Sequence, residues 1–484
     1  MAAAANEHNQ AYAYAADRAS AEKGTGSDTD ADSRTNVFAA LVAEEADHDI
    51  KYRTLSWRKA TLLLFGEYVC LAILALPWSF SVLGWVTGLI VQIGIGLITW
   101  YTSYVLWQYQ MRHPDCRDIC DIAAKLFPRF GRLAYEATAV MLLLNNLFVV
   151  GFHVFTGAKI LNTLDDSKMC NVVFQVVSAI IGIIVSLPRT LNHVSLMSVV
   201  SASCMGIAIL LSLVYVGIEP HPGVGYGKHG VYPGLGEVKT YAGIPGGSVS
   251  FVDGVNAMLN ITFLWIGQIL YPSFIAEMRE PRDFPKALAA LTLLEMILFT
   301  VVSVVGYRYL GQYATAPMMG SLANTKYKKS AFAFVLVPTV VIGAIYSNVA
   351  AKYVYNRIIG PNSRHTHSHT LVGWGTWVGI VVAIWAIGFV LGNVIPSMGD
   401  FLSIMSGAFD SFFGFFFWAV AYYHLNRGSL FSSVSKTAQS ILNVFIFAIG
   451  LFMLGPGLYT SVKAIILDYA GPTRKPFSCT PVAI

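Results

Sequence analysis

Apolar residues dominate the chain from about residue 60 onward, in long runs separated by short polar segments. Runs of this length cross a bilayer as helices, because lipid cannot satisfy an exposed backbone. The pattern therefore predicts an all-α, polytopic membrane protein with eleven transmembrane helices. Their approximate bounds are 60–83, 86–109, 133–160, 171–190, 194–218, 253–277, 286–309, 331–356, 371–395, 399–424 and 437–465.

Two of these spans, the first and the sixth, contain residues that an uninterrupted helix disfavours. The first carries Glu67 and Pro77, and the sixth carries Gly267 and Pro272. A proline removes a backbone donor and clashes with the preceding turn, and an open backbone at membrane depth needs protein or a cavity beside it. We therefore predict that both helices are broken, as in the binding sites of secondary transporters. The alternative is a pair of proline-kinked anchor helices.

A long loop, 219–252, is rich in glycine and proline and separates the first five spans from the next five. This division matches a five-plus-five inverted repeat with one extra helix, in which the first and sixth spans correspond. We predict that this transporter domain covers residues 51–470. A disordered acidic tail at 1–50 precedes it, and a short tail at 471–484 follows it.

The basic residues predict the orientation of the chain, because short cytoplasmic loops are enriched in lysine and arginine. They place the N-terminus in the cytoplasm, and the odd number of spans then places the C-terminus outside. Cys170 and Cys479 both fall on the outer, oxidising side. A disulfide between them and two free thiols are the two possibilities.

Composition narrows the class of protein. Hydrophobic residues make up 55% of the chain and charged residues 12%, which excludes an ordinary soluble protein. The net charge of +5 does not indicate a nucleic-acid partner, because the basic residues lie in short loops between apolar runs. The six cysteines lack zinc-site spacing, and we expect neither a metal nor a cofactor. No phosphate-binding glycine loop is present, which disfavours an ATP-driven pump.

Two segments carry a resemblance to a known family. Segment 72–77 reads AILALP and is followed at 83–85 by LGW, and segment 277–288 reads EMREPRDFPKAL. They are similar to the first-span signature and to the charged exit of the sixth span in the amino acid/auxin permease family, closest to its fungal neutral amino acid permeases. The resemblance runs from about Ser56 to the last span. It implies a LeuT-like fold and proton-driven uptake of amino acids. The family usually has glycines before the Ile-Leu pair, where this chain has Cys70 and Ala72.

The implied substrates carry an α-carboxylate and an α-ammonium group. The N-terminus of the second half of the first span can offer N–H donors to the carboxylate, and carbonyls freed in the sixth span can accept from the ammonium. For the side chains of the sixth span, packing within the bundle is the alternative. The predicted substrate-binding residues are Cys70, Leu71, Ala72, Ile73, Asn145, Asn146, Phe263, Leu264, Trp265 and Gly267.

Asn145 and Asn146 lie near the middle of the third span. Adjacent positions on a helix point about 100° apart, so we expect at most one of them to face the central cavity. Interhelical hydrogen bonding is the alternative role for either. Ser347 and Asn348 lie in the eighth span without a carboxylate beside them in sequence, so we do not expect a sodium site there.

Glu67 is the predicted proton-coupling residue. It lies about one helical turn before the predicted break, within reach of the cavity. Glu295 and Asp410 are the other acids at membrane depth, and intramembrane acids are functional candidates by default. Neither lies beside a predicted break. The structural alternative is that Glu67 accepts hydrogen bonds that hold the broken helix together.

The sequence therefore predicts a secondary transporter that imports neutral aliphatic and aromatic amino acids by proton symport, and not an enzyme. Its partners are the amino acid, protons and the lipid bilayer, with the plasma membrane the expected location and the vacuolar membrane the alternative. Two other functions remain open. One is a membrane acyltransferase that uses His113 and Asp118, which have an H-x4-D spacing. The other is an amino acid exporter of an internal membrane.

Overall fold

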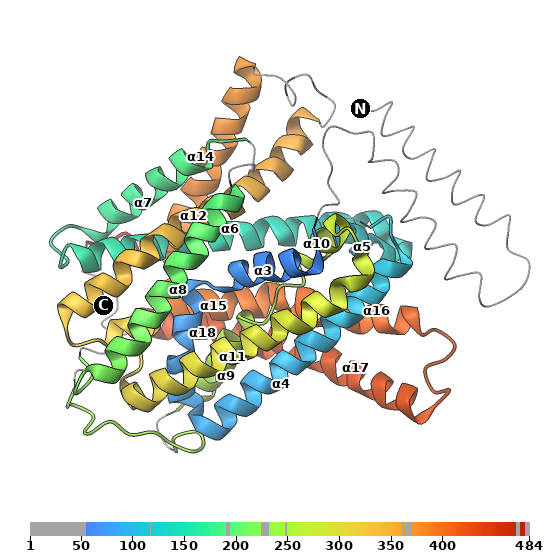
Figure 1. Ribbon diagram of the computed structural model, residues 1–484. Coiled ribbons are helices and arrows are strands. Elements are labelled where there is room, and N and C mark those ends of the chain that lie inside the picture. Colours follow the sequence, from blue (N-terminus) through green and yellow to red (C-terminus); the bar gives the residue numbers. More distant parts are fainter. Residues whose placement is uncertain are drawn as a thin grey trace, which may run out of the picture.

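The computed structural model describes residues 55–116, 118–189, 194–223, 232–246, 249–360, 363, 365, 370–470 and 475–479. The described chain consists of helices and loops, and its only pairing of the β type is a bridge between Leu55 and Met278. The helices lie side by side in a bundle (Figure 1). The predicted acidic tail at 1–50 lies outside the described residues.

The first predicted span is broken at the predicted place. Helix α3 (Trp57–Tyr68) is followed by a short 3-10 helix, η2 (Leu71–Ala75), and by α4 (Leu76–Arg112). Pro77 lies in the first turn of α4, where its missing N–H has no intrahelical partner to lose and its fixed φ suits a helix. The helical path is therefore interrupted at Val69 and Cys70.

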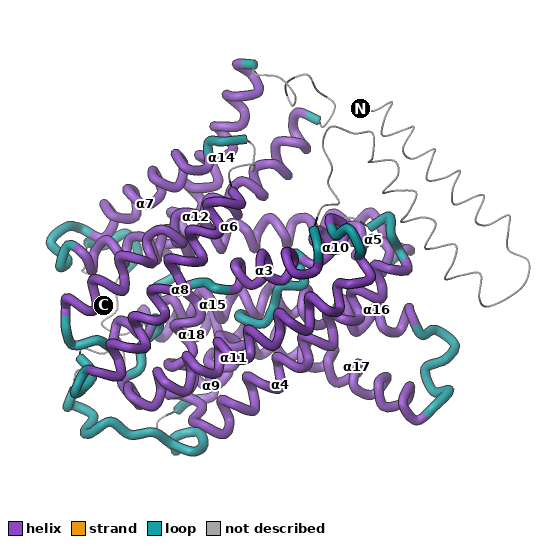
Figure 2. Tube along the Cα trace, in the orientation of Figure 1, coloured by secondary structure: helices purple, strands orange, loops and turns teal. Residues whose placement is uncertain are grey.

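The sixth predicted span is broken in the same way. Helix α9 (Phe251–Phe263) and helix α10 (Tyr271–Glu277) are separated by the non-helical segment 264–270. Pro272 again occupies the first turn of the second half. Figure 2 shows these non-helical stretches in the middle of the bundle, between helices rather than at its ends.

Gly84 separates the first span from the second inside the long helix α4. Its φ of 76° and ψ of 177° are not helical, and this region favours glycine. A side chain there would also overlap the carbonyl oxygen of Gly243. Loop 219–252 packs on this turn through two backbone hydrogen bonds. Trp85 N donates to Tyr241 O (2.9 Å), and Val86 N donates to Ala242 O (2.7 Å).

The remaining helices complete the bundle. Residues 406–416 form a π-helix, η9, which divides the tenth predicted span into α15 and α16. The other elements are α5 (Ile119–Leu126), η3 (Pro128–Phe130), α6 (Gly131–Leu164), α7 (Asn171–Ser186), α8 (Val194–Ile218), η6 (Pro281–Asp283), α11 (Phe284–Leu310), η7 (Gly311–Tyr313), η8 (Met318–Ser321), α12 (Thr325–Ile359), α14 (Leu371–Val394), α15 (Met398–Met405), α16 (Phe417–Leu425), α17 (Val434–Phe452), η10 (Met453–Gly457) and α18 (Leu458–Ala470).

Eight helical segments of the described chain are long and apolar enough to cross a membrane. One of them, Leu71–Arg112, joins the second half of the first predicted span to the second span. Helix α7 is apolar but shorter, and α9 with α10 is interrupted. The protein is thus a multi-pass membrane protein, and the number of eleven spans stays a prediction.

The helices pack in two groups. Helices α3, α4, α9 and α11 pack against one another and surround both breaks, whereas α6, α7, α12 and α14 pack together beside them. The second group has a hydrophobic cluster of its own, which contains Trp377 and Trp385. Figure 1 shows α7, α12 and α14 on one side of the picture and α4, α9 and α11 on the other.

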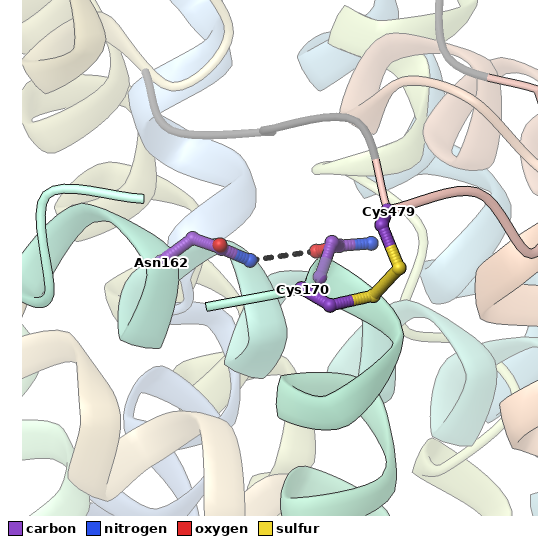
Figure 3. Close-up of a disulfide and its surroundings, with 4 residues drawn as sticks. Asn162, Cys170 and Cys479 are labelled. Carbon is purple, nitrogen blue, oxygen red and sulfur yellow. Dashed lines mark hydrogen bonds between the residues drawn. A yellow bond between two sulfur atoms is a disulfide. The ribbon is translucent and has the colours of Figure 1, made fainter. Parts of the chain in front are cut away.

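A disulfide joins Cys170 and Cys479 (Figure 3). Next to it, Asn162 Nδ2 donates to Asn171 Oδ1 at 2.7 Å, so the end of α6 is tied to the start of α7. Of the two possibilities for these cysteines, the structure contains the bond. It brings the start of α7 and the segment after α18 to the same end of the bundle, an arrangement that the predicted odd number of spans also gives.

Candidate functional site

The first break exposes backbone donors. Cys70 is extended, with φ −121° and ψ 170°. The N–H group of Leu71, the first residue of η2, donates to no described acceptor. The N–H groups of Ala72 and Ile73 point to the Cys70 thiol, and that of Ile73 also reaches Cys70 O at 3.3 Å. Free donors at a helix N-terminus carry a partial positive charge. This end of the break can therefore bind an anion such as a carboxylate.

The second break exposes backbone acceptors. The N–H of Ile266 reaches Phe263 O only at 3.5 Å, and the carbonyls of Leu264 and Trp265 accept from no described donor. The carbonyl oxygens that directly follow α9 are thus without partners, and together with the C-terminus of the helix they provide a partial negative charge. This end can bind a cation such as an ammonium group.

The side chain of Trp265 packs within the bundle. It is 3% exposed, and its ring contacts Phe299 of α11 with 5.0 Å between ring centroids. On the other side it lies against Gly96 of α4, where an added Cβ would be 2.8 Å from the ring. The indole therefore packs in the bundle, and a substrate-binding role for Trp265 stays a prediction.

A hydrogen bond joins the two breaks. Tyr68, the last residue of α3, and Tyr271, the first residue of α10, have their hydroxyl oxygens 2.7 Å apart. Gly267 lies directly against the Tyr68 hydroxyl, and a Cβ at this position would overlap it. A glycine is needed here because the unwound backbone approaches the phenol so closely. The sequence predicted Gly267 but not the tyrosine pair.

The two asparagines of α6 lie on different faces of the helix. Asn145 is three residues from Phe148 and seven from Phe152, so the three share a face, and these rings contact Phe409 and Phe401 of the tenth predicted span. Asn146 shares a face with Val150, which packs in the cluster of α14. Both asparagines are buried and bond to no described residue. Asn145 is the better candidate for the site.

Three acids lie near the breaks. Glu67 is partly buried and pairs with no described residue. Tyr346 of α12 is an electrostatic neighbour of Glu67, Cys70 and Asp410, so it connects the first break to the π-helix that carries Asp410. Asp410 Oδ2 is buried without a described partner. π-Helical turns occur frequently at functional sites, and the sequence did not predict this one.

The expectation that neither Glu295 nor Asp410 lies beside a break is wrong for Glu295. Glu295 lies in electrostatic contact with Tyr68 and Tyr271, which flank the two breaks. It is 3% exposed, and its Oε1 has no described partner. The prediction failed because sequence spacing along α11 does not say which neighbouring helix a residue faces.

Two polar groups of α12 are also unsatisfied. Ser347 Oγ and Asn348 Oδ1 are buried without a described hydrogen-bond partner. The described residues contain no cluster of three His, Cys, Asp or Glu side chains that could hold a metal ion. The expectation that no sodium ion binds at Ser347 and Asn348 stays a prediction.

His113 and Asp118 have structural roles. Asp118 caps α5, and its Oδ1 accepts from Cys120 N and Asp121 N at 2.9 Å each. Burial raises the pKa of the Asp118 carboxyl, while the two N–H bonds act in the opposite direction. His113 ends α4 and lies against the Tyr109 ring. No hydrogen bond joins His113 to Asp118 in the described chain, and the Asp118 carboxylate is engaged as the cap of α5.

A protein-family model for the transmembrane amino acid transporter protein matches residues 53–463. The chain belongs to this transmembrane amino acid transporter family. The N amino acid transport system protein of Neurospora crassa is 32% identical over 443 residues, which cover 91% of either chain. A transmembrane transporter of Gibberella moniliformis is 27% identical over 457 residues, covering 94% of this chain and 92% of the relative.

Solved structures support the fold of this transporter. The inward-facing conformation of Mhp1 matches with a TM-score of 0.51 and 12% identity, over 90% of this chain and 94% of Mhp1. The fold is therefore the predicted LeuT-like one with two broken helices. The family and these relatives are transporters, so the protein is not an enzyme and the acyltransferase alternative is set aside.

Proposed function

We propose that this amino acid transporter imports neutral amino acids together with protons. The observation that carries the proposal is the pairing of two unlike backbone ends. One is the free N–H group of Leu71, next to the Ala72 N–H that only the Cys70 thiol accepts, and the other is the pair of free carbonyls at Leu264 and Trp265. An amino acid carries the complementary groups on one carbon, a carboxylate and an ammonium. The donors bind the carboxylate and the carbonyls bind the ammonium.

Selectivity follows from the residues around the breaks. Cys70, Leu71, Phe263 and Leu264 offer no charge to a substrate side chain, and Glu67 is the one acid beside them in the sequence. A charged side chain would lose its hydration here without gaining a partner. The residues around the breaks therefore favour aliphatic and aromatic substrate side chains over those of arginine and glutamate.

Glu67 carries the coupling proton in this proposal. It is one residue before Tyr68 and three before Cys70, so it lies at the edge of the break, and no described residue pairs with it. A partly buried carboxyl without a partner is free to exchange its proton with whichever side the cavity opens to. We expect Glu67→Gln to bind and exchange amino acid but to lose accumulation driven by a pH gradient.

The test uses purified protein in liposomes, with a panel of labelled amino acids and an imposed pH gradient. Leucine and phenylalanine should accumulate when the outside is acidic, and the gradient should have no effect on Glu67→Gln, which should still exchange internal for external leucine. Equal uptake of arginine or glutamate would contradict the selectivity. A Glu67→Gln protein that still concentrates leucine would remove Glu67 from the mechanism. For an importer, we propose the plasma membrane as the location.

A further inference from the structure

Helices α3 and α10 are tied together at both ends. Figure 1 shows them next to each other in the bundle. At one end, Leu55 N donates to Glu277 O at 3.2 Å and Arg279 N donates to Leu55 O at 2.9 Å. At the other end lies the hydrogen bond between the Tyr68 and Tyr271 hydroxyls, at 2.7 Å.

This pair of half-helices faces the cytoplasm in the predicted topology. Helix α3 begins within the basic segment 51–59, and α10 ends in the charged segment 277–288. A path from the breaks to the cytoplasm must pass α3 and α10. The Tyr68–Tyr271 hydrogen bond lies where α3 and α10 adjoin the two breaks. It therefore joins the half-helices at the end of the path that is nearest the breaks.

One acid can control this bond. Glu295 is an electrostatic neighbour of both hydroxyls, is 3% exposed and has an unpartnered Oε1. Helix α3, which packs against α11, carries Arg58 and Lys59 in its first turn and Glu67 next to Tyr68. Arg112 is the only charged residue of α4, and it donates to Leu425 O. Helix α8 has no charged residue and a single thiol, Cys204. Tyr346 of α12 lies near Tyr68.

We propose that Tyr68, Tyr271 and Glu295 form a proton-operated latch that closes the cytoplasmic side of the binding site. The proposal rests on the proposed function for its orientation and for the use of protons. When Glu295 is protonated it is neutral, and the hydroxyls remain bonded to each other. When the proton leaves to cytoplasmic water, a buried carboxylate stands without partners, which is strongly unfavourable.

The carboxylate is satisfied only if the latch opens. An ionised carboxyl accepts two or more hydrogen bonds, and the two hydroxyls are donors within its electrostatic reach. If both donate to Glu295, neither donates to the other, and the bond between α3 and α10 is lost. Separation of the half-helices also admits water to the carboxylate. Loss of the proton on the cytoplasmic side therefore opens the site toward the cytoplasm, where the substrate leaves.

Cys70 reports on this opening, because it lies in the first break and is only partly buried. The other free thiols, Cys116, Cys120 and Cys204, are replaced by alanine, and the Cys170–Cys479 bond is kept. Inside-out vesicles without amino acid are treated with a maleimide over a range of pH. Each rate is divided by that of the denatured protein at the same pH, which removes the intrinsic pH dependence of the thiol.

The parent protein should label slowly at acidic pH and several-fold faster at alkaline pH. Glu295→Gln should label slowly at every pH, because the amide stays neutral, whereas Glu295→Asp should keep the pH dependence. Tyr271→Phe and Tyr68→Phe should label fast even at acidic pH. The matched control is Tyr101→Phe, which removes a phenol that Asn443 bonds at 2.6 Å between α4 and α17. It should behave like the parent.

Parent-like pH dependence in Glu295→Gln would overturn the role of Glu295. Slow labelling of Cys70 at acidic pH in both tyrosine variants would overturn the hydroxyl latch. If Glu295→Gln fails to insert into the membrane, the two tyrosine variants alone test whether the latch exists. A response seen only from the external face would also contradict the proposal. Because no amino acid or gradient is present, a wrong substrate class leaves this experiment unaffected. Glu67 is an electrostatic neighbour of Cys70, so the series is repeated in a Glu67→Gln background, where the same dependence on Glu295 should remain.

Discussion

The two breaks differ in length and in the chemistry they expose. The first involves only Val69 and Cys70 before η2 starts, and it presents N–H groups. The second takes the seven residues 264–270 and presents carbonyls. Both are followed by a proline in the first turn of the next helix. A proline after each break thus accompanies opposite partial charges. The first break presents the N-terminus of η2, whereas the second presents the C-terminus of α9.

This difference suits a substrate with two charged ends and a variable side chain. The backbone recognises what all amino acids share, and side chains around the breaks select among them. Substitutions that alter the backbone of a break should therefore affect every substrate, whereas side-chain substitutions should be milder. The predictions below proceed from the largest expected effect to the smallest.

Gly267→Ala should abolish transport of every amino acid. A Cβ at Gly267 would overlap the Tyr68 hydroxyl, so the second break cannot keep its position beside α3. The matched control is Gly254→Ala in α9, where nothing lies within 4 Å of an added Cβ. Uptake measurements with equal amounts of inserted protein compare the two. Normal uptake by Gly267→Ala would show that the close approach is dispensable.

Leu71→Pro should raise the KM for all amino acids about tenfold or more. Proline removes the N–H of the first residue of η2, and the extended Cys70 before it has a conformation that proline accepts. Loss of one hydrogen bond to a charged group costs roughly 1.5–3 kcal/mol. Leu71→Ala, which loses the side chain but keeps the N–H, is the control. If both variants change KM equally, the donor does not contact substrate.

Trp265→Phe should leave KM nearly unchanged and lower stability slightly. The indole packs between α4 and α11, and its Nε1 has no described partner, so no hydrogen bond is lost. The smaller ring leaves a cavity, for which we expect a cost of roughly 1–2 kcal/mol. Thermal unfolding in detergent and uptake kinetics measure the two effects. A large rise in KM would place the indole in the substrate site.

Cys479→Ser should have the smallest effect on transport. The Cys170–Cys479 bond ties α7 to the segment after α18 and does not involve the residues of either break. We expect uptake within about twofold of the parent and a lower unfolding temperature, because the bond restricts the unfolded chain. Peptide mapping without reductant verifies the bond in the parent. A severe loss of uptake would indicate that the outer end of the bundle is coupled to the breaks.

Much of the fold can be predicted from local signals. Pro77 and Pro272 are sufficient to locate both breaks, because a proline within an apolar run has few tolerable positions. Apolar runs and the glycine-rich loop predict the helices and their division into repeats. The pairing of Cys170 with Cys479 was only a possibility, because distance between them depends on how the helices pack.

The contacts between helices could not be predicted. Tyr68 and Tyr271 are separated by 203 residues in the chain, and hydrophobic periodicity does not define the rotation of one buried helix against another. Glu295 was placed away from the breaks for the same reason. The π-helix around Asp410 was also missed, because the sequence pattern of an inserted residue within a helix is weak.

The most direct test of the account compares leucine with two analogues, its methyl ester and N-acetylleucine, as inhibitors of leucine uptake. The ester lacks the carboxylate charge and the acetyl derivative lacks the ammonium. Both should inhibit the parent poorly. In Leu71→Pro, the preference for leucine over the ester should collapse, while the preference over N-acetylleucine should persist, because only the carboxylate end of the site has changed. If Leu71→Pro weakens leucine and its ester by the same factor, the first break does not bind the carboxylate and the central claim is wrong.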